Sequence, residues 1–176
     1  MNAFDPTTPA GLCGFVATAG LAVWPLFRTR CAMLSTQLGA LALLSLHYAL
    51  MGVTTAAIVN GLGTLQLVAC LAFGTHPRLR FLGYGLAGLM VVSSIVTWQG
   101  LVSALSTSGN LVIAFGRLQT RAEVMRLLVL AGMPFWVLHD LLIESPVVLA
   151  DVLSLAVGVV ALVWRNSVDG ATAQRS

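Results

Sequence analysis

Long apolar runs separated by short polar or glycine-containing breaks dominate this chain. A helix needs about 20 mainly apolar residues to cross a hydrocarbon core of about 30 Å, and the breaks leave seven stretches of roughly that length. The runs lack the sustained apolar–polar alternation of barrel strands. We therefore predict an all-α integral membrane protein with seven transmembrane helices, near residues 10–27, 31–51, 54–74, 80–97, 101–117, 122–143 and 146–164.

Composition supports this fold class. Hydrophobic residues make up 58% of the chain and charged residues 9%, whereas a soluble domain carries about 25% charged residues. The formal net charge is +3, and every basic residue is arginine. These arginines lie mostly between the apolar runs, so we read the positive charge as a topology signal and expect no nucleic-acid partner.

The arginines also orient the helices. They occupy alternate connections, and the connections between these carry no basic residue. By the positive-inside rule the basic loops are cytoplasmic, which predicts an N-terminus outside, a C-terminus inside and a short polar, unstructured cytoplasmic tail at 166–176. The basic connections contain Arg28 and Arg30, Arg78 and Arg80, and Arg117 and Arg121.

Two parts of the sequence repeat. Arg30 and Arg121 lie 91 residues apart, and Asn60 and Asp151 share this offset. The offset between His47 and His139 is 92, so one inserted and one removed residue reconcile the two registers. The chain therefore looks like a duplicated unit.

The repeat predicts the domain organisation. Residues 10–74 form a first three-helix bundle, 101–164 form a second, and 80–97 is a single linker helix. A single helix between two three-helix units gives both units the same membrane orientation, so the repeats are parallel, as in some transporters. We thus expect a 3+1+3 parallel-repeat arrangement.

Polar side chains at matched places inside membrane segments are candidates for a solute pathway. Asn60 and Thr64 share a helix face, where they line a pocket or hydrogen-bond neighbouring helices. Asp151 needs a cationic or hydrogen-bonded partner, or a proton, inside a membrane. His47 and His139 are either interfacial residues or a shared pair able to relay protons.

Further polar and aromatic positions have two readings each. Asn110 ends a polar stripe with Ser103, Ser106 and Thr107, which either packs helices or lines a cavity. Asp140 and Glu144 form a solvated rim or an acidic vestibule. Tryptophans near helix ends are expected to anchor in the interface, with Trp136 the one expected to face a pocket. The anchors are Trp24, Trp98 and Trp164.

Several of these runs resemble a known family. The 3+1+3 layout, the run from Tyr48 to Gly52 and the sequence Asn60-Gly61-Leu62-Gly63 resemble the SWEET, semi-SWEET and PQ-loop superfamily of small-solute facilitators. Within it, the chain is most similar to the bacterial inner-membrane YgjV-type proteins. That closer likeness rests on the His47 run with Asn60, Trp136-x-x-His139 and Trp164-Arg165.

The resemblance implies a multi-pass protein of the bacterial inner (plasma) membrane with a central substrate pocket. In SWEET-type proteins, an Asn of helix 3, its counterpart in helix 7 and an aromatic near the end of helix 2 or 6 line that pocket. The matching positions are Asn60, Asp151 and Tyr48. The chain departs from the pattern at Asp151 and at Asp140, where an aromatic is expected, so a sugar pocket is not implied.

The leading hypothesis is transport of a small polar solute, sugar-like or another small metabolite, by alternating access between the two bundles. The rival is a membrane adaptor or assembly protein that keeps the fold without transporting, and an intramembrane enzyme using His139 and Asp151 is a third. The chain lacks a nucleotide loop, a Ser/His/Asp triad and paired metal ligands. We therefore expect no enzyme activity, cofactor or metal, and leave a homo-oligomer open.

The three hypotheses differ in what they predict for the centre of the molecule. Transport predicts that Asn60, Asp151 and the two histidines face one shared cavity. An adaptor predicts a sealed centre and a large apolar patch on one flank. An enzyme predicts a histidine within hydrogen-bond reach of a carboxylate.

Overall fold

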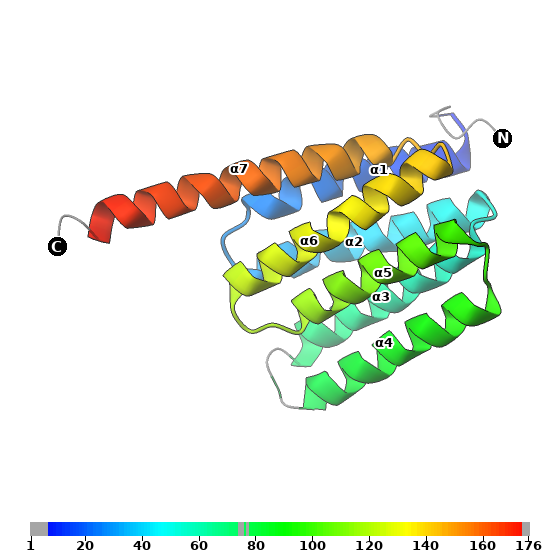
Figure 1. The fold of residues 1–176 in the computed structure, drawn as a ribbon, viewed down its shortest axis with the longest axis horizontal. Coiled ribbons are helices and arrows are strands. Elements are labelled where there is room, and N and C mark those ends of the chain that lie inside the picture. The colour runs from blue at the N-terminus through cyan, green and yellow to red at the C-terminus, as the bar shows by residue number, and fades with distance from the viewer. Residues whose placement is uncertain (1–6, 74–75, 77, 174–176) are drawn as a thin grey trace.

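The computed structural model describes residues 7–73, 76 and 78–173, and in these residues the chain is helical, without strands (Figure 1). Seven α-helices and one short 3-10 helix follow one another along this described part of the chain. They are α1 (Pro9–Val23), η1 (Trp24–Leu26), α2 (Arg30–Leu50), α3 (Thr54–Phe73), α4 (Arg78–Val96), α5 (Leu101–Arg117), α6 (Ala122–Leu142) and α7 (Val148–Ala173).

Local chemistry determines where the first helices begin and end. The Thr8 hydroxyl accepts a hydrogen bond from the Gly11 backbone N–H at 3.1 Å, and a proline occupies the first turn of α1, where its missing N–H costs nothing. Thr29 caps α2 in the same way through Ala32. The first predicted helix, 10–27, breaks after Val23 into η1, which contains Pro25.

The last helix differs from its prediction. α7 begins at Val148 and continues to Ala173, so residues 166–173 are helical where an unstructured tail was predicted, and residues 174–176 lie outside the described part of the chain. No proline interrupts this segment, and extending an existing helix fixes only one more residue per hydrogen bond gained. Because α7 starts at Val148 and not at the predicted residue 146, Asp151 lies in its first turn.

The helices pack as two groups of three. α1 packs on α2 and α2 on α3, while α5 packs on α6 and α6 on α7. The two groups meet along two seams, α3 against α5 and α1 against α7. α4 covers the outside of the α3–α5 seam and lies at one edge of the molecule (Figure 1).

Close helix contact within the second group depends on glycine. A Cβ on Gly132 of α6 would lie 2.6 Å from Ile113 Cγ1 and 2.9 Å from the Gly109 carbonyl oxygen of α5. Both distances are shorter than any van der Waals contact allows. The two backbones therefore approach as closely as small residues permit in membrane helices.

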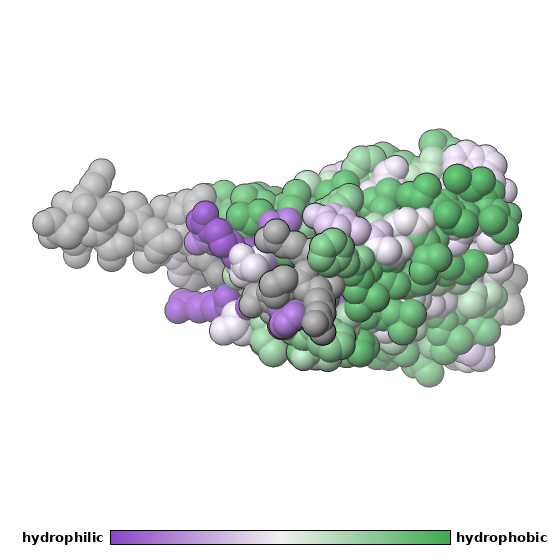
Figure 2. All heavy atoms as spheres, turned by 90° about the horizontal axis from the view of Figure 1, so that it is seen from below, coloured by the Kyte–Doolittle hydropathy of each residue, from purple (hydrophilic) through white to green (hydrophobic). Residues whose placement is uncertain are grey.

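The surface is suited to lipid. Four segments are long and apolar enough to cross a membrane, namely Pro9–Leu26, α2, α3 and α6, and shorter apolar segments lie in α4 and α7. The face shown in Figure 2 is mainly hydrophobic, and hydrophilic side chains gather near the end from which α7 protrudes. The fold is therefore that of a helical membrane protein, and the count of seven spans stays a prediction.

Arginines tie the two groups together at the end that carries the α1–α2 and α5–α6 connections. Arg30 donates from Nε to the Gln119 carbonyl at 3.0 Å and from Nη2 to the Arg117 carbonyl at 2.9 Å. In the opposite direction, Arg126 Nη2 donates to the Phe27 carbonyl at 2.9 Å. Each group thus caps backbone carbonyls of the other.

Candidate functional site

A cavity of about 40 Å³ lies between the two helix groups. This volume has room for about three water molecules. Side chains from both groups line it, and most of the lining is apolar. The polar lining residues are Gln37, Tyr48, Asn60, Asn110, Arg117 and Asp151.

The cavity is elongated along α2. Gln37 and Tyr48 both line it, and their separation of eleven residue positions corresponds to about 16 Å of helix. Arg117, the last residue of α5, lines the end near Gln37. Tyr48 and Asp151 line the other end, so a guanidinium and a carboxyl lie at opposite ends.

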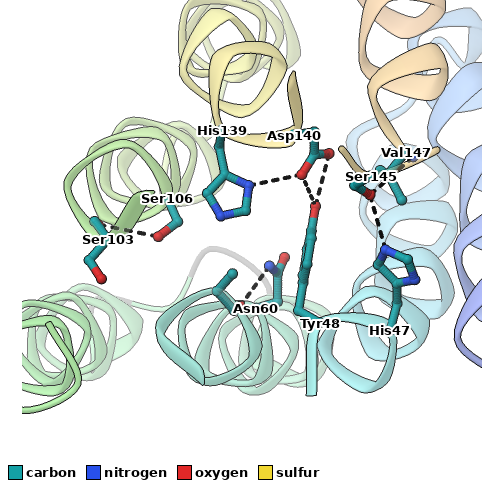
Figure 3. Close-up of polar contacts among 10 residues, drawn as sticks. His47, Tyr48, Asn60, Ser103, Ser106, His139, Asp140, Ser145 and Val147 are labelled. Carbon is teal, nitrogen blue, oxygen red and sulfur yellow. Dashed lines mark hydrogen bonds and ion pairs between the residues drawn. The ribbon is translucent and has the colours of Figure 1, made fainter. Parts of the chain in front are cut away.

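An aromatic and acidic network closes the Tyr48 end (Figure 3). The Tyr48 hydroxyl lies 2.7 Å from Asp140 Oδ1 and 2.9 Å from Oδ2, and donates to this carboxyl group. His139 Nδ1 lies 2.8 Å from the same Oδ1. The Tyr48 ring stacks on Trp136 with centroids 5.7 Å apart, so the network joins α2 and α6 across the seam between the groups.

Asn60 and Asp151, the matched pair of the predicted repeat, both line this cavity. Asn60 Nδ2 donates to the Ala56 carbonyl of its own helix at 2.9 Å. Asp151 is 3% exposed, and its Oδ2 has no hydrogen-bond partner within the part of the chain that is described. The Asp151 carboxyl also interacts with that of Asp140, which connects the cavity to the Tyr48 network.

His47 has a structural role. Its Nδ1 lies 2.8 Å from the Ala10 carbonyl, which only accepts, so Nδ1 carries the proton. Nε2 then accepts from the Ser145 hydroxyl at 3.0 Å, and Ser145 Oγ accepts from the Val147 N–H at 3.2 Å. His47 therefore joins α1, α2 and the α6–α7 connection with both ring nitrogens satisfied.

Arg117 is buried at the opposite end, 1% exposed. Its Nε donates to Gln37 Oε1 at 3.3 Å, and its Nη1 has no partner among the described residues. A Cβ on Gly63 would lie 3.0 Å from Nη1, so the guanidinium occupies the space that this glycine leaves. The sequence places Arg117 at a helix end and gives no sign that its side chain turns inward.

The remaining predicted site residues differ in whether they line the cavity. Of these residues, Tyr48, Trp136 and Asn110 line it, whereas His47, His139 and Thr64 do not. Thr64 bonds the Asn60 carbonyl at 2.9 Å. Gln37, which the sequence analysis missed, could have been found as a polar residue within an apolar run.

Ser103, at the start of the polar stripe, serves packing. Only Asn110 of its four members lines the cavity. Ser103 Oγ accepts from the Gln99 N–H at 2.7 Å and lies 2.8 Å from Thr55 Oγ1, while Thr55 donates to the Thr97 carbonyl. These bonds hold α3, the end of α4 and the start of α5 together.

Two expectations are wrong. Asp140 is fully buried and belongs to no solvated rim, although Glu144 is exposed. Trp24 is 1% exposed and donates from Nε1 to Ser154 Oγ at 2.8 Å, so it fastens α7 to η1 instead of anchoring in the interface. The position of a tryptophan near the end of a predicted helix suggested an anchor, but it does not show whether the ring points toward lipid or toward the protein interior.

Comparison with known families identifies the chain at the level of a family. The model of the Imp-YgjV family, described as a bacterial inner membrane protein, matches residues 10–167. The chain belongs to the Imp-YgjV family. This match covers all of the cavity lining and agrees with the lipid-facing surface. No curated protein and no solved structure matches this Imp-YgjV chain.

Proposed function

We propose that this Imp-YgjV protein transports a small polar solute across the inner membrane by alternating access between two three-helix bundles, 10–74 and 101–164. The central cavity carries this proposal. Buried polar atoms are nearly always hydrogen-bonded, yet four cavity residues, each at most 3% exposed, have a polar atom without a partner among the described residues. They are Gln37 Nε2, Asn110 Nδ2, Arg117 Nη1 and Asp151 Oδ2.

The packing supports a parallel 3+1+3 repeat, and with it the SWEET-like plan. Each group packs its helices in chain order, and each seam joins the third helix of one group to the first helix of the other. Such seams are expected when two like units are related by an axis along the membrane normal. The hydrogen-bonded residues Tyr48 and Asp140 also lie at equivalent places, 92 residues apart.

Rocking of the bundles requires contacts that break at one end at a time. Arg30 and Arg126 join the groups at one end through backbone carbonyls. Tyr48 and Asp140 join them at the other end. Hydrogen bonds to charged groups contribute a net free energy of about 1.5–3 kcal/mol each, so water can replace either set when that end opens.

The alternatives have less support. His139 and Asp140 are within hydrogen-bond reach, which an enzyme would require, but both are fully buried and neither lines the cavity. An adaptor predicts a sealed centre, and the partnerless atoms of Asn110 and Asp151 on the cavity do not support one. Transport is therefore the function that the geometry supports best.

The test is a thermal-shift screen of small solutes, followed by uptake into proteoliposomes between about pH 5 and 8. Asn60→Ala is expected to weaken binding by about 1–3 kcal/mol through loss of a buried hydrogen bond. Asp151→Asn should fold and transport, but lose any pH dependence, because an amide does not titrate. Thr64→Ala, outside the cavity, is the control.

Either of two results would contradict the proposal. One is a wild type that takes up none of the solutes that raise its unfolding midpoint. The other is a set of three variants that all match the wild type in rate and pH profile, which would make Asn60 and Asp151 packing residues.

A further inference from the structure

The unpartnered atoms at the Arg117 end of the cavity are all donors. We infer that Arg117, Gln37 and Asn110 form a binding subsite for an oxyanion, such as the carboxylate of a small solute. This inference rests on the proposed function, because it takes the cavity to be the solute site. It adds the chemical class of the solute, an anion of only a few heavy atoms.

Hydrogen-bond chemistry determines which side-chain atoms at this end of the cavity remain without a partner. A guanidinium only donates, so Gln37 must present its carbonyl oxygen to Arg117 Nε, and the contact of 3.3 Å fixes the orientation of the amide. The free end of Gln37 is therefore the donor Nε2, which has no partner in the described structure. Asn110 Nδ2 and Arg117 Nη1 complete a set of three donors.

The three side chains converge near Gly63. A Cβ built there would lie 3.0 Å from Arg117 Nη1 and 3.8 Å from Asn110 Oδ1, while Gln37 is bonded to the same guanidinium. Only a residue without a side chain leaves room here for the guanidinium. The site is therefore built from α2, α3 and α5 together, and both helix groups contribute to it.

The charge at this site has no carboxylate partner. Among the described side chains, Arg121 pairs with Glu123, and His139 lies 2.8 Å from Asp140. Arg117, at 1% exposure, makes no such pair, and a guanidinium keeps its proton in proteins. A buried charge is costly unless it is paired. An oxyanion supplies both the charge and the acceptors, whereas a neutral sugar supplies no charge.

The test uses the purified full-length protein in detergent at constant ionic strength set with sodium chloride. Pyruvate, inorganic phosphate and glucose are titrated, and the unfolding midpoint is measured. Pyruvate or phosphate should raise the midpoint of the wild type, and glucose should raise it less. Arg117→Gln should weaken the anion response about tenfold or more, the loss expected for a charged hydrogen bond. The control Arg121→Gln removes an equal charge from an exposed position and should respond like the wild type.

A second variant decides the question if Arg117→Gln does not fold. Gln37→Glu places a carboxylate beside the guanidinium, so the protein supplies its own anion. Its midpoint without ligand should be at least that of the wild type, and its response to pyruvate and phosphate should be lost. An unchanged anion response in Gln37→Glu would overturn the subsite.

Other outcomes separate the subsite from the transport proposal. A response to glucose alone that Asn60→Ala weakens would overturn the anion subsite and leave transport intact. A response to short-chain phosphatidylglycerol without one to pyruvate or phosphate would assign the site to a lipid headgroup. It would overturn the proposal that the ligand is a small soluble anion. Anion binding that needs Arg117, without uptake into proteoliposomes, would support the subsite and contradict transport.

Discussion

At the scale of single residues, two kinds of buried polar side chain differ in their hydrogen bonds. His47 has both ring nitrogens bonded, and the Tyr48 hydroxyl bonds both oxygens of Asp140. Buried hydrogen bonds of this type hold their side chains in one arrangement. Arg117 and Asp151 instead keep a partnerless atom on the cavity. We assign structural roles to the first kind and solute contact to the second.

Tyr48→Phe tests the structural kind. The substitution keeps the ring stacked on Trp136 but removes the donor to Asp140, which leaves a buried carboxyl with one partner fewer. We expect the free energy of unfolding to fall by about 1–3 kcal/mol. The control is Tyr84→Phe, at a ring that is 55% exposed on α4. Equal unfolding midpoints in detergent for the two variants would contradict this role.

The sequence predicts some of these residues and misses others for a physical reason. Asn60, Asp151 and Asn110 are short, so a polar side chain inside an apolar run has to be buried close to its own backbone. Arg117 is long and ends α5, and a long side chain at a helix end reaches either solvent or the interior. The linear pattern does not distinguish these two directions.

At the scale of elements, α2 and α6 end in the same way. After α2, the Val53 N–H bonds the Tyr48 carbonyl at 2.9 Å, and after α6, the Ser145 N–H bonds the Asp140 carbonyl at 2.9 Å. Each motif needs a residue with positive φ, which is Gly52 at 77° and Glu144 at 52°. Both helix ends are Schellman motifs, which favour glycine at the residue with positive φ. α2 has glycine at this position, and α6 has glutamate.

Substitutions at these two helix ends are expected to change stability in opposite directions. Glu144→Gly removes the steric cost of positive φ at an exposed residue and should raise the free energy of unfolding by about 0.5–1 kcal/mol. Gly52→Ala introduces that cost and should lower it by about 1 kcal/mol. Thermal unfolding in detergent measures both. A Glu144→Gly variant less stable than the wild type would show that the Glu144 side chain makes a contact that matters more than its backbone.

Element boundaries are well predicted wherever composition changes sharply. The bounds of α2, α3 and α5 differ by one residue or less from those predicted, because apolar runs end at polar or glycine residues. The end of α7 is not predicted, since a polar sequence is compatible with both helix and tail. The internal repeat is visible in the sequence only as a few matched polar positions.

At the scale of the whole molecule, two helix groups meet along two seams and enclose a cavity between them. The membrane class follows from composition, and the assignment to helices follows from run length. The cavity does not follow from either, because its shape depends on which side chains meet at the seams. The predicted shared cavity contains Asn60 and Asp151, whereas the two histidines lie outside its lining.

Topology is a separate prediction at this scale. If the basic connections are cytoplasmic, Arg28→Cys should react with a membrane-impermeant thiol reagent only from the inside, and Gln99→Cys only from the outside. Both positions are exposed. The background replaces Cys13, Cys31 and Cys70 by alanine. Labelling of Arg28→Cys from the outside would reverse the predicted orientation.

The central claim is that the cavity opens to both sides of the membrane, and the accessibility of Asn110→Cys tests this claim most directly without a known solute. In the same cysteine-free background, we predict labelling by the impermeant reagent from the outside of intact cells and from the cytoplasmic side of inside-out vesicles. Met90→Cys, at a fully buried position away from the cavity, should be labelled from neither side. Labelling of Asn110→Cys from one side only, or from neither, would contradict alternating access.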